Sequence, residues 1–283
     1  MKNLNLWIDS LRLSMTLPAA ALVHMGFVLS GHPTNWLSVA IVFVVAVATM
    51  LQNDYDDRFH DFPKGKRLAY HNPKIFRLVL FVLWTFVIIF SAKVLTDSHF
   101  QGFLLFVCTA IGIFYSYSRQ VAFLPLFLMA FTSSLPALFA LRLEISAILC
   151  IGLCIAVFSI IMGREIIKDF EDKDIDKGYK KTIFTEKIMS EKMAMKWSAV
   201  LILAGLLITF LFRPSHSDFA SLLYWFGAVC CLVSIIGLWA GTNSTTAKKS
   251  VLDIGIGLIV ISFSLLPFLP DMKAWIFGYY TLL

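Results

Sequence analysis

Two stretches of this sequence carry aspartates at the same spacing. The first begins at Asn53 and reads Asn-Asp-Tyr-Asp-Asp-Arg-Phe-His-Asp, and the second runs from Arg164 to Asp176. Each contains the pattern DxxDxxxD, which places three carboxylates on one face of a continuing helix. The six aspartates of the two patterns are Asp54, Asp57, Asp61, Asp169, Asp172 and Asp176.

Three carboxylates on one helical face repel one another unless positive charge lies among them. Mg²⁺ fits this role, because it prefers oxygen ligands and commonly binds one or two carboxylates together with substrate phosphates. We therefore predict all six aspartates as metal ligands, directly or through water, and Mg²⁺ as the cofactor. Two such sites facing each other would hold a polyphosphate.

Basic side chains near the two patterns could contact the phosphate oxygens, as arginine and lysine commonly do. These residues are Arg58, Arg67, Arg119, Arg164 and Lys168. Solvated surface loops are the simplest alternative, but two copies at identical spacing favour a binding site. An EF-hand calcium loop starting at Asp172 does not fit, because Lys177 and Ile183 stand where the glycine and the final glutamate are required.

The composition places this chemistry at a membrane. Of the 283 residues, 59% are hydrophobic and only 15% are charged, and the mean hydropathy is +0.80. This composition excludes a secreted disulfide scaffold, a nucleic-acid-binding domain and a disordered chain. The five cysteines lie inside apolar runs and show no metal-binding spacing, so we interpret them as core residues.

Long apolar runs recur along the whole chain, with the length that a helix needs to cross a bilayer. We therefore predict an all-α, polytopic membrane protein with nine transmembrane helices, forming one integral-membrane domain over residues 1–283. The predicted spans are 13–31, 36–52, 75–92, 100–117, 121–141, 145–163, 196–212, 219–240 and 251–269.

The distribution of basic residues predicts the orientation. With nine spans and the N-terminus in the cytoplasm, 20 of the 24 lysines and arginines fall on the cytoplasmic side, as the positive-inside rule requires. The aspartate-rich loops, about 53–72 and 164–196, are then cytoplasmic, and the C-terminus lies on the opposite side. The net charge of +6 reflects this orientation and contact with the lipid bilayer, and it requires no nucleic acid.

A metal-held polyphosphate at the mouth of a helical bundle suits a substrate that joins a diphosphate to an apolar chain. Prenyl diphosphates have both parts. Mg²⁺ would neutralise the charge that develops on the leaving diphosphate, and a dry aromatic cavity would shield the allylic cation from water. We therefore predict an enzyme that ionises a prenyl diphosphate.

These residues resemble the UbiA superfamily of intramembrane prenyltransferases over nearly the full length of the chain. The family pattern NDxxDxxxD after the second helix corresponds to the stretch from Asn53 to Asp61, and the second aspartate pattern follows the sixth helix. The family's YxxxK element corresponds to Tyr115 and Arg119, with arginine in place of lysine. Arg12 resembles an early arginine of the family.

The resemblance implies a roughly circular bundle around a central cavity that is roofed by the two aspartate-rich loops. It assigns Asn53 and Lys168 to positioning the diphosphate, with Tyr115, Arg119 and Arg164 as helpers. The stretch 164–172 is most similar to branches related to digeranylgeranylglyceryl phosphate synthases, whereas residues 62–67 depart from that branch. The expected activity is therefore prenyl transfer from a prenyl diphosphate donor to an aromatic or other lipophilic acceptor.

Three other functions remain open at this stage. A terpene cyclase of the same family would use the same ionisation machinery without an acceptor. A transporter would generally carry charged sites near the bilayer midplane, where these spans hold few charged residues. A degenerate member acting as a scaffold is disfavoured, because all six motif aspartates are present.

Overall fold

The protein is described by a computed structural model. Every element that it describes is helical. The described residues are 7, 10–30, 32–60, 68–139, 141, 146–176, 181–184, 186–210, 218–240 and separate positions between 249 and 261.

The helices follow one another with short connections. The α-helices are α2 (Leu13–Leu29), α3 (Trp36–Asp56), α4 (Leu68–His71), α5 (Pro73–Asp97), α6 (His99–Phe114), α7 (Leu124–Ser134), α8 (Ser146–Asp176), α9 (Glu191–Thr209) and α10 (Asp218–Ala240). Two 3₁₀ helices, η1 (Tyr115–Gln120) and η2 (Leu135–Leu138), directly follow α6 and α7.

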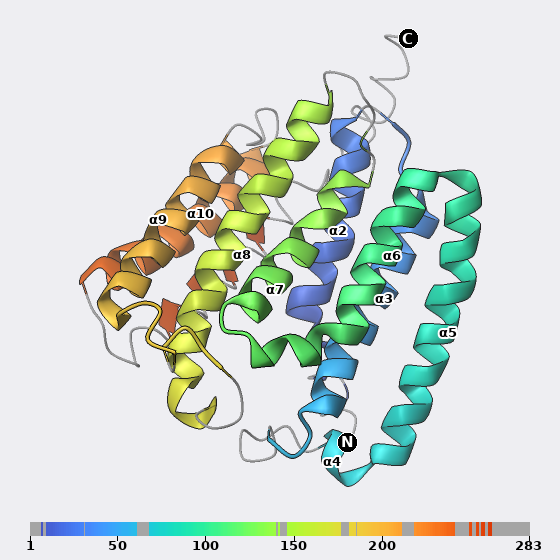
Figure 1. Ribbon diagram of the computed structural model, residues 1–283. Coiled ribbons are helices and arrows are strands. Elements are labelled where there is room, and N and C mark those ends of the chain that lie inside the picture. Colours follow the sequence, from blue (N-terminus) through green and yellow to red (C-terminus); the bar gives the residue numbers. More distant parts are fainter. Residues whose placement is uncertain are drawn as a thin grey trace.

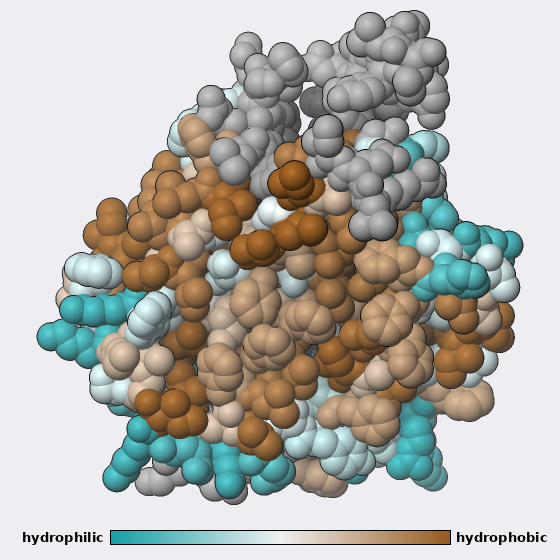
Figure 2. All heavy atoms as spheres, turned by 45° about the horizontal axis from the view of Figure 1, so that its top comes forward, coloured by the Kyte–Doolittle hydropathy of each residue, from teal (hydrophilic) through white to brown (hydrophobic). Residues whose placement is uncertain are grey.

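Six helices within the described residues are long and apolar enough to cross a bilayer, and two shorter apolar helices accompany them. They coincide with eight of the predicted spans. The ninth predicted span, 251–269, lies mostly outside the described residues. Large apolar side chains cover much of the outer surface, and Figure 2 shows them as a broad brown area with hydrophilic residues along its lower margin. The chain is therefore a polytopic membrane protein.

Side-chain caps fix where several of these helices begin. The Asn35 side chain accepts hydrogen bonds from the backbone N–H groups of Leu37 and Ser38 at the start of α3. Ser98 and Ser190 accept in the same way at the starts of α6 and α9. These oxygens satisfy N–H groups that have no partner inside the helix.

The helices form two groups that meet along α2, η2 and α8 (Figure 1). One apolar cluster joins α2, α3, α5, α6 and η2, and another joins α7, α8, α9 and α10. A smaller cluster of Leu22, Met25, Ala137 and Leu153 connects the groups. Packing across this contact places the ends of α3 and α8 at the same end of the bundle.

Glycines bring α8 and α9 into close contact. A Cβ atom at Gly163 of α8 would lie 2.8 Å from the backbone oxygen of Ser198, and one at Gly205 of α9 would lie 2.7 Å from that of Ala156. Both distances are too short for ordinary packing, so each helix needs a glycine where the other crosses it.

We expect Gly205→Leu to destabilise the protein by about 1–3 kcal/mol, because the added side chain forces α8 and α9 apart. Thermal unfolding in detergent measures the effect. Ala204→Leu is the matched control, since Ala204 is exposed on the neighbouring face of the same helix. Equal melting temperatures for the two variants would contradict this account of the interface.

Some predicted boundaries were wrong. Helix α3 continues to Asp56 and α8 to Asp176, so the predicted loops 53–72 and 164–196 both begin as helix. The spans predicted at 100–117 and 121–141 each end in a 3₁₀ helix. Pro136 lies in the first turn of η2, and a proline there removes an N–H group that a continuing α-helix would use.

Candidate active site

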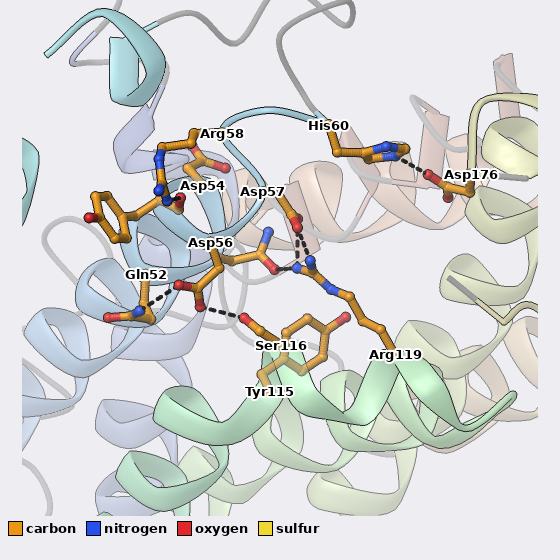
Figure 3. A network of polar contacts seen from close by, with 12 residues as sticks. Gln52, Asp54, Asp56, Asp57, Arg58, His60, Tyr115, Ser116, Arg119 and Asp176 are labelled. Atoms are coloured by element: carbon orange, nitrogen blue, oxygen red, sulfur yellow. Dashed lines mark hydrogen bonds and ion pairs between the residues drawn. The ribbon is translucent and has the colours of Figure 1, made fainter. Parts of the chain in front are cut away.

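Three segments far apart in the sequence meet at one end of the bundle, here called the motif end. They are the last turn of α3 with residues 57–60, the 3₁₀ helix η1, and the last turns of α8 with residues 181–184. His60 Nε2 lies 2.8 Å from Asp176 Oδ1, which joins the two aspartate motifs (Figure 3). The backbone N–H of Lys181 donates to the Arg119 carbonyl at 3.0 Å, which joins η1 to the second motif.

Asp54, in the last turn of α3, is only 5% exposed and forms an ion pair with Arg12. Arg12 caps the start of α2 with a left-handed backbone, at φ 45°, a conformation that costs a non-glycine residue free energy. Its guanidinium also contacts Met50 Sδ at 3.6 Å. The Arg12 guanidinium, which is far from the motif in the sequence, thus neutralises the first carboxylate of the motif.

Asp57 follows the end of α3 and is buried against Arg119 of η1. The Arg119 Nη2 group donates to Asp57 Oδ2 at 2.6 Å and to Asn53 Oδ1 at 2.5 Å, and its Nη1 group also pairs with Asp57. Figure 3 shows the guanidinium directed at the Asp57 carboxylate. Because α3 ends at Asp56, Asp54 and Asp57 face different arginines instead of sharing one cation.

The second motif remains helical through its last aspartate, because α8 extends to Asp176. Asp169 and Asp176 are buried, with 4% and 1% of their surface exposed, and Asp172 is half-buried. Asp169 Oδ2 accepts a hydrogen bond from the backbone N–H of Ile183 at 3.3 Å. This bond folds residues 181–184 back over the end of α8.

Other predicted residues of α8 also lie near the motif end. Lys168 is half-buried beside Asp169. Arg164 donates to its neighbour Glu165 at 2.6 Å, and the buried Nε atom of Arg164 has no hydrogen-bond partner among the described residues. Glu165 is 8% exposed, so α8 contributes a further buried acid that the DxxDxxxD spacing does not single out.

Tyr115 lies between the two motifs. Its element, η1, contacts both motifs, since the Arg119 side chain pairs with Asp57 and the Arg119 carbonyl accepts a hydrogen bond from the Lys181 N–H. The Arg119 guanidinium lies 5.8 Å from the centre of the Tyr115 ring, within the range of a cation–π contact. The YxxxK-like element therefore brings its two residues to the centre of the motif end.

Arg58 is placed away from this centre. Its guanidinium lies over the rings of Tyr55 and Phe59, at 4.4 and 4.6 Å from their centroids, and donates to the Tyr55 carbonyl at 2.8 Å. Asp61 and Arg67 lie outside the described residues. His60 is a residue that the sequence analysis missed; its position inside the first motif, next to Asp61, was the only available signal.

The side chains at the motif end have the donor chemistry that Mg²⁺ requires. Among the described residues, no three His, Cys, Asp or Glu side chains converge as a metal cluster. However, Asp54, Asp57, Asp169 and Asp176 are buried carboxylates, and Mg²⁺ needs only one or two of these with phosphate and water. Arg12 and Arg119 already hold positive charge against two of them. The chemistry of these oxygen donors fits a divalent cation, although in this structure arginines pair with two of them.

An apolar cavity of about 70 Å³ lies inside the bundle, and Tyr115 forms part of its lining. Its walls come from α2, α3, α6 and α7, and its polar lining is confined to a few hydroxyl groups, including those of Thr49 and Thr132. Met50 lines the cavity and also contacts Arg12. The cavity and the motif end are therefore adjacent parts of one site.

The overall fold has counterparts among solved structures. No protein-family model and no curated protein matches the sequence. Among solved structures, an apo UbiA homologue from Aeropyrum pernix K1 superposes with a TM-score of 0.67 at 18% identity, covering 92% of this chain and 99% of that one. A structure of digeranylgeranylglyceryl phosphate synthase superposes with a TM-score of 0.62 at 17% identity, covering 94% of this chain and 98% of that one. The chain therefore has the same fold as these two proteins.

Proposed function

We propose that the protein is a Mg²⁺-dependent intramembrane prenyltransferase. It would ionise a prenyl diphosphate and transfer the prenyl group to an aromatic or other lipophilic acceptor. The observation that carries the proposal is the meeting of two aspartate motifs, with four of their aspartates buried, at one end of a fold shared with a UbiA homologue, next to an apolar cavity. We further propose that this end faces the cytoplasm, in accordance with the distribution of basic residues.

In this proposal the six motif aspartates hold the metal. Bound Mg²⁺ would neutralise the charge that develops on the departing diphosphate. Asn53 and Lys168 position the diphosphate, and the guanidinium groups of Arg12 and Arg119 offer N–H donors of the kind that bind phosphate oxygens. Arg164 has a buried Nε–H group available for the same purpose.

In this proposal the cavity that Tyr115 helps to line receives the first part of the prenyl chain. Its apolar walls exclude water from the allylic carbon, and the Tyr115 ring presents an aromatic surface at the boundary between the diphosphate and the chain. Side chains as flexible as Met15, Met50 and Met129 line the cavity, so the walls can adapt to a bound chain by changes of rotamer.

The proposal is tested by diphosphate release from farnesyl and geranylgeranyl diphosphate, with and without Mg²⁺ and with a panel of lipophilic acceptors, followed by mass spectrometry of the products. We expect release that requires Mg²⁺ and an acceptor. Mg²⁺-dependent release that yields a hydrocarbon or terpene alcohol alone would identify a cyclase. Absence of release with every donor and acceptor would refute both enzymatic functions. Ion uptake into liposomes would then test the transporter alternative.

A further inference from the structure

Asp56 lies between Asp54 and Asp57 in the first motif, but the structure gives its carboxylate different neighbours. Asp56 is the last residue of α3 and is half-buried. Its Oδ2 atom accepts a hydrogen bond from Ser116 Oγ at 2.5 Å, and its Oδ1 atom accepts one from Gln52 Nε2 at 3.0 Å (Figure 3). Both donors are neutral, whereas Asp54 and Asp57 each face an arginine.

The hydrogen bonds of Asp56 continue into a chain across three helices. Gln52 Oε1 accepts a weaker hydrogen bond from Trp84 Nε1 of α5 at 3.4 Å. Trp84, Gln52, Asp56 and Ser116 therefore link α5, α3 and η1. Trp84 holds the Gln52 side chain, and Gln52 and Ser116 donate to different oxygens of Asp56. The orientation of the Asp56 carboxylate is therefore fixed from both sides.

Ser116 and Arg119 attach η1 to the end of α3 at two points. In a 3₁₀ helix, side chains three residues apart lie one above the other, so these two side chains leave η1 on the same face. Ser116 reaches Asp56, and Arg119 reaches Asp57 and Asn53. Loss of the first attachment would allow η1 to rotate and would move the Arg119 guanidinium.

We propose that Asp56 and Ser116 form a positioning pair that fixes the rotation of η1 and thereby places Arg119 and Tyr115 in the site. Asp56 acts through its hydrogen bonds and is not a metal ligand, although it lies among residues that are. The catalytic consequence rests on the proposed prenyltransferase function. The positioning itself does not, because it is a property of the metal-free protein.

Substitutions distinguish a role of Asp56 as a hydrogen-bond acceptor from a role that requires its negative charge. In Asp56→Asn, Oδ1 can still accept from Gln52 while Nδ2 donates to the Ser116 hydroxyl, so the pair is retained without the charge. We expect Asp56→Ala and Ser116→Ala each to raise the Mg²⁺ concentration for half-maximal rate by about tenfold, and Asp56→Asn to stay within about threefold of the wild type. The double variant Asp56→Ala/Ser116→Ala should be no worse than either single one, because both remove one interaction.

Hydrogen exchange of the metal-free protein provides a readout that does not depend on catalysis. We expect the backbone amides of residues 115–120 to exchange about tenfold faster in Asp56→Ala and Ser116→Ala, and at the wild-type rate in Asp56→Asn. Ser159→Ala is the matched control, because the Ser159 hydroxyl donates only to the Ile155 carbonyl of its own helix at 2.8 Å. In the Mg²⁺ titration, a smaller folded fraction would lower the maximal rate but would not change the Mg²⁺ concentration for half-maximal rate.

Two results would overturn the proposal. One is an Asp56→Asn variant as inactive as Asp54→Asn, which would show that the charge of Asp56 is required. The other is unchanged exchange of residues 115–120 in Ser116→Ala. A wild-type protein that releases no diphosphate would instead refute the proposed function, and the exchange measurement would still decide whether Asp56 and Ser116 hold η1.

Discussion

Asp169→Asn is expected to lower diphosphate release by at least about a thousandfold while leaving the protein folded, since it removes a charge that the proposed metal site requires. The Asp169 side chain is buried at the end of α8, where its Oδ2 atom accepts a hydrogen bond from the Ile183 N–H. Asparagine keeps an oxygen for that bond. Asp169→Ala should lose activity equally and also some stability, because the Ile183 N–H then loses its acceptor.

Two measurements check this expectation: diphosphate release at saturating Mg²⁺ and thermal unfolding in detergent. Asp97→Asn is the control, since Asp97 is an exposed aspartate at the end of α5 whose ion pair among the described residues is with Lys93 at 3.9 Å. It should retain wild-type release. Activity of Asp169→Asn within tenfold of the wild type would remove Asp169 from the metal site.

Arg119→Ala is expected to destabilise the protein by about 3–5 kcal/mol, because it removes the guanidinium that pairs with the buried Asp57 carboxylate. The Arg119 and Asp57 side chains are only 9% and 10% exposed, so water cannot replace the lost ion pair. The same variant should lose most of its catalytic activity, since Asn53 loses its contact with Arg119 as well. Thermal unfolding and diphosphate release measure the two effects.

A double variant separates stability from catalysis at this position. Asp57→Ala/Arg119→Ala should recover most of the stability that Arg119→Ala loses, because no unpaired charge remains buried. It should remain inactive, since both groups belong to the proposed site. Recovery of activity together with stability would show that the pair serves folding alone. Arg119→Lys should retain part of both properties, since lysine keeps the charge but not the two-pronged geometry.

The sequence predicted the parts of this molecule that depend on periodicity and charge. Apolar runs placed eight of the helices, and the even number of spans between the motifs predicted that Asp54 and Asp169 lie at the same end of the bundle. The hydrogen bond between His60 and Asp176 is consistent with that prediction. The spacing of Asp169, Asp172 and Asp176 places them on one face only if the helix continues, and α8 does continue through all three.

The sequence could not predict which cation faces which carboxylate. Arg58 is adjacent to Asp57 in the chain, yet its side chain lies over Tyr55, while Arg119 comes from a distant segment to bind Asp57. That choice depends on where α3 ends and how η1 is rotated, and neither is encoded in a local pattern. The different surroundings of Asp54, Asp56 and Asp57 arise from tertiary contacts with two separate segments, the start of α2 and η1.

The position of the ion pairs along the chain sets an order for assembly during synthesis. Both arginine pairs of the first motif lie within residues 12–119, so the ribosome delivers all their members before α8 is made. Asp54 and Asp57 can therefore be neutralised in a nascent half-protein inside the membrane. The contacts of His60 with Asp176 and of Arg119 with Lys181 can form only later, when the second half inserts and encloses the site.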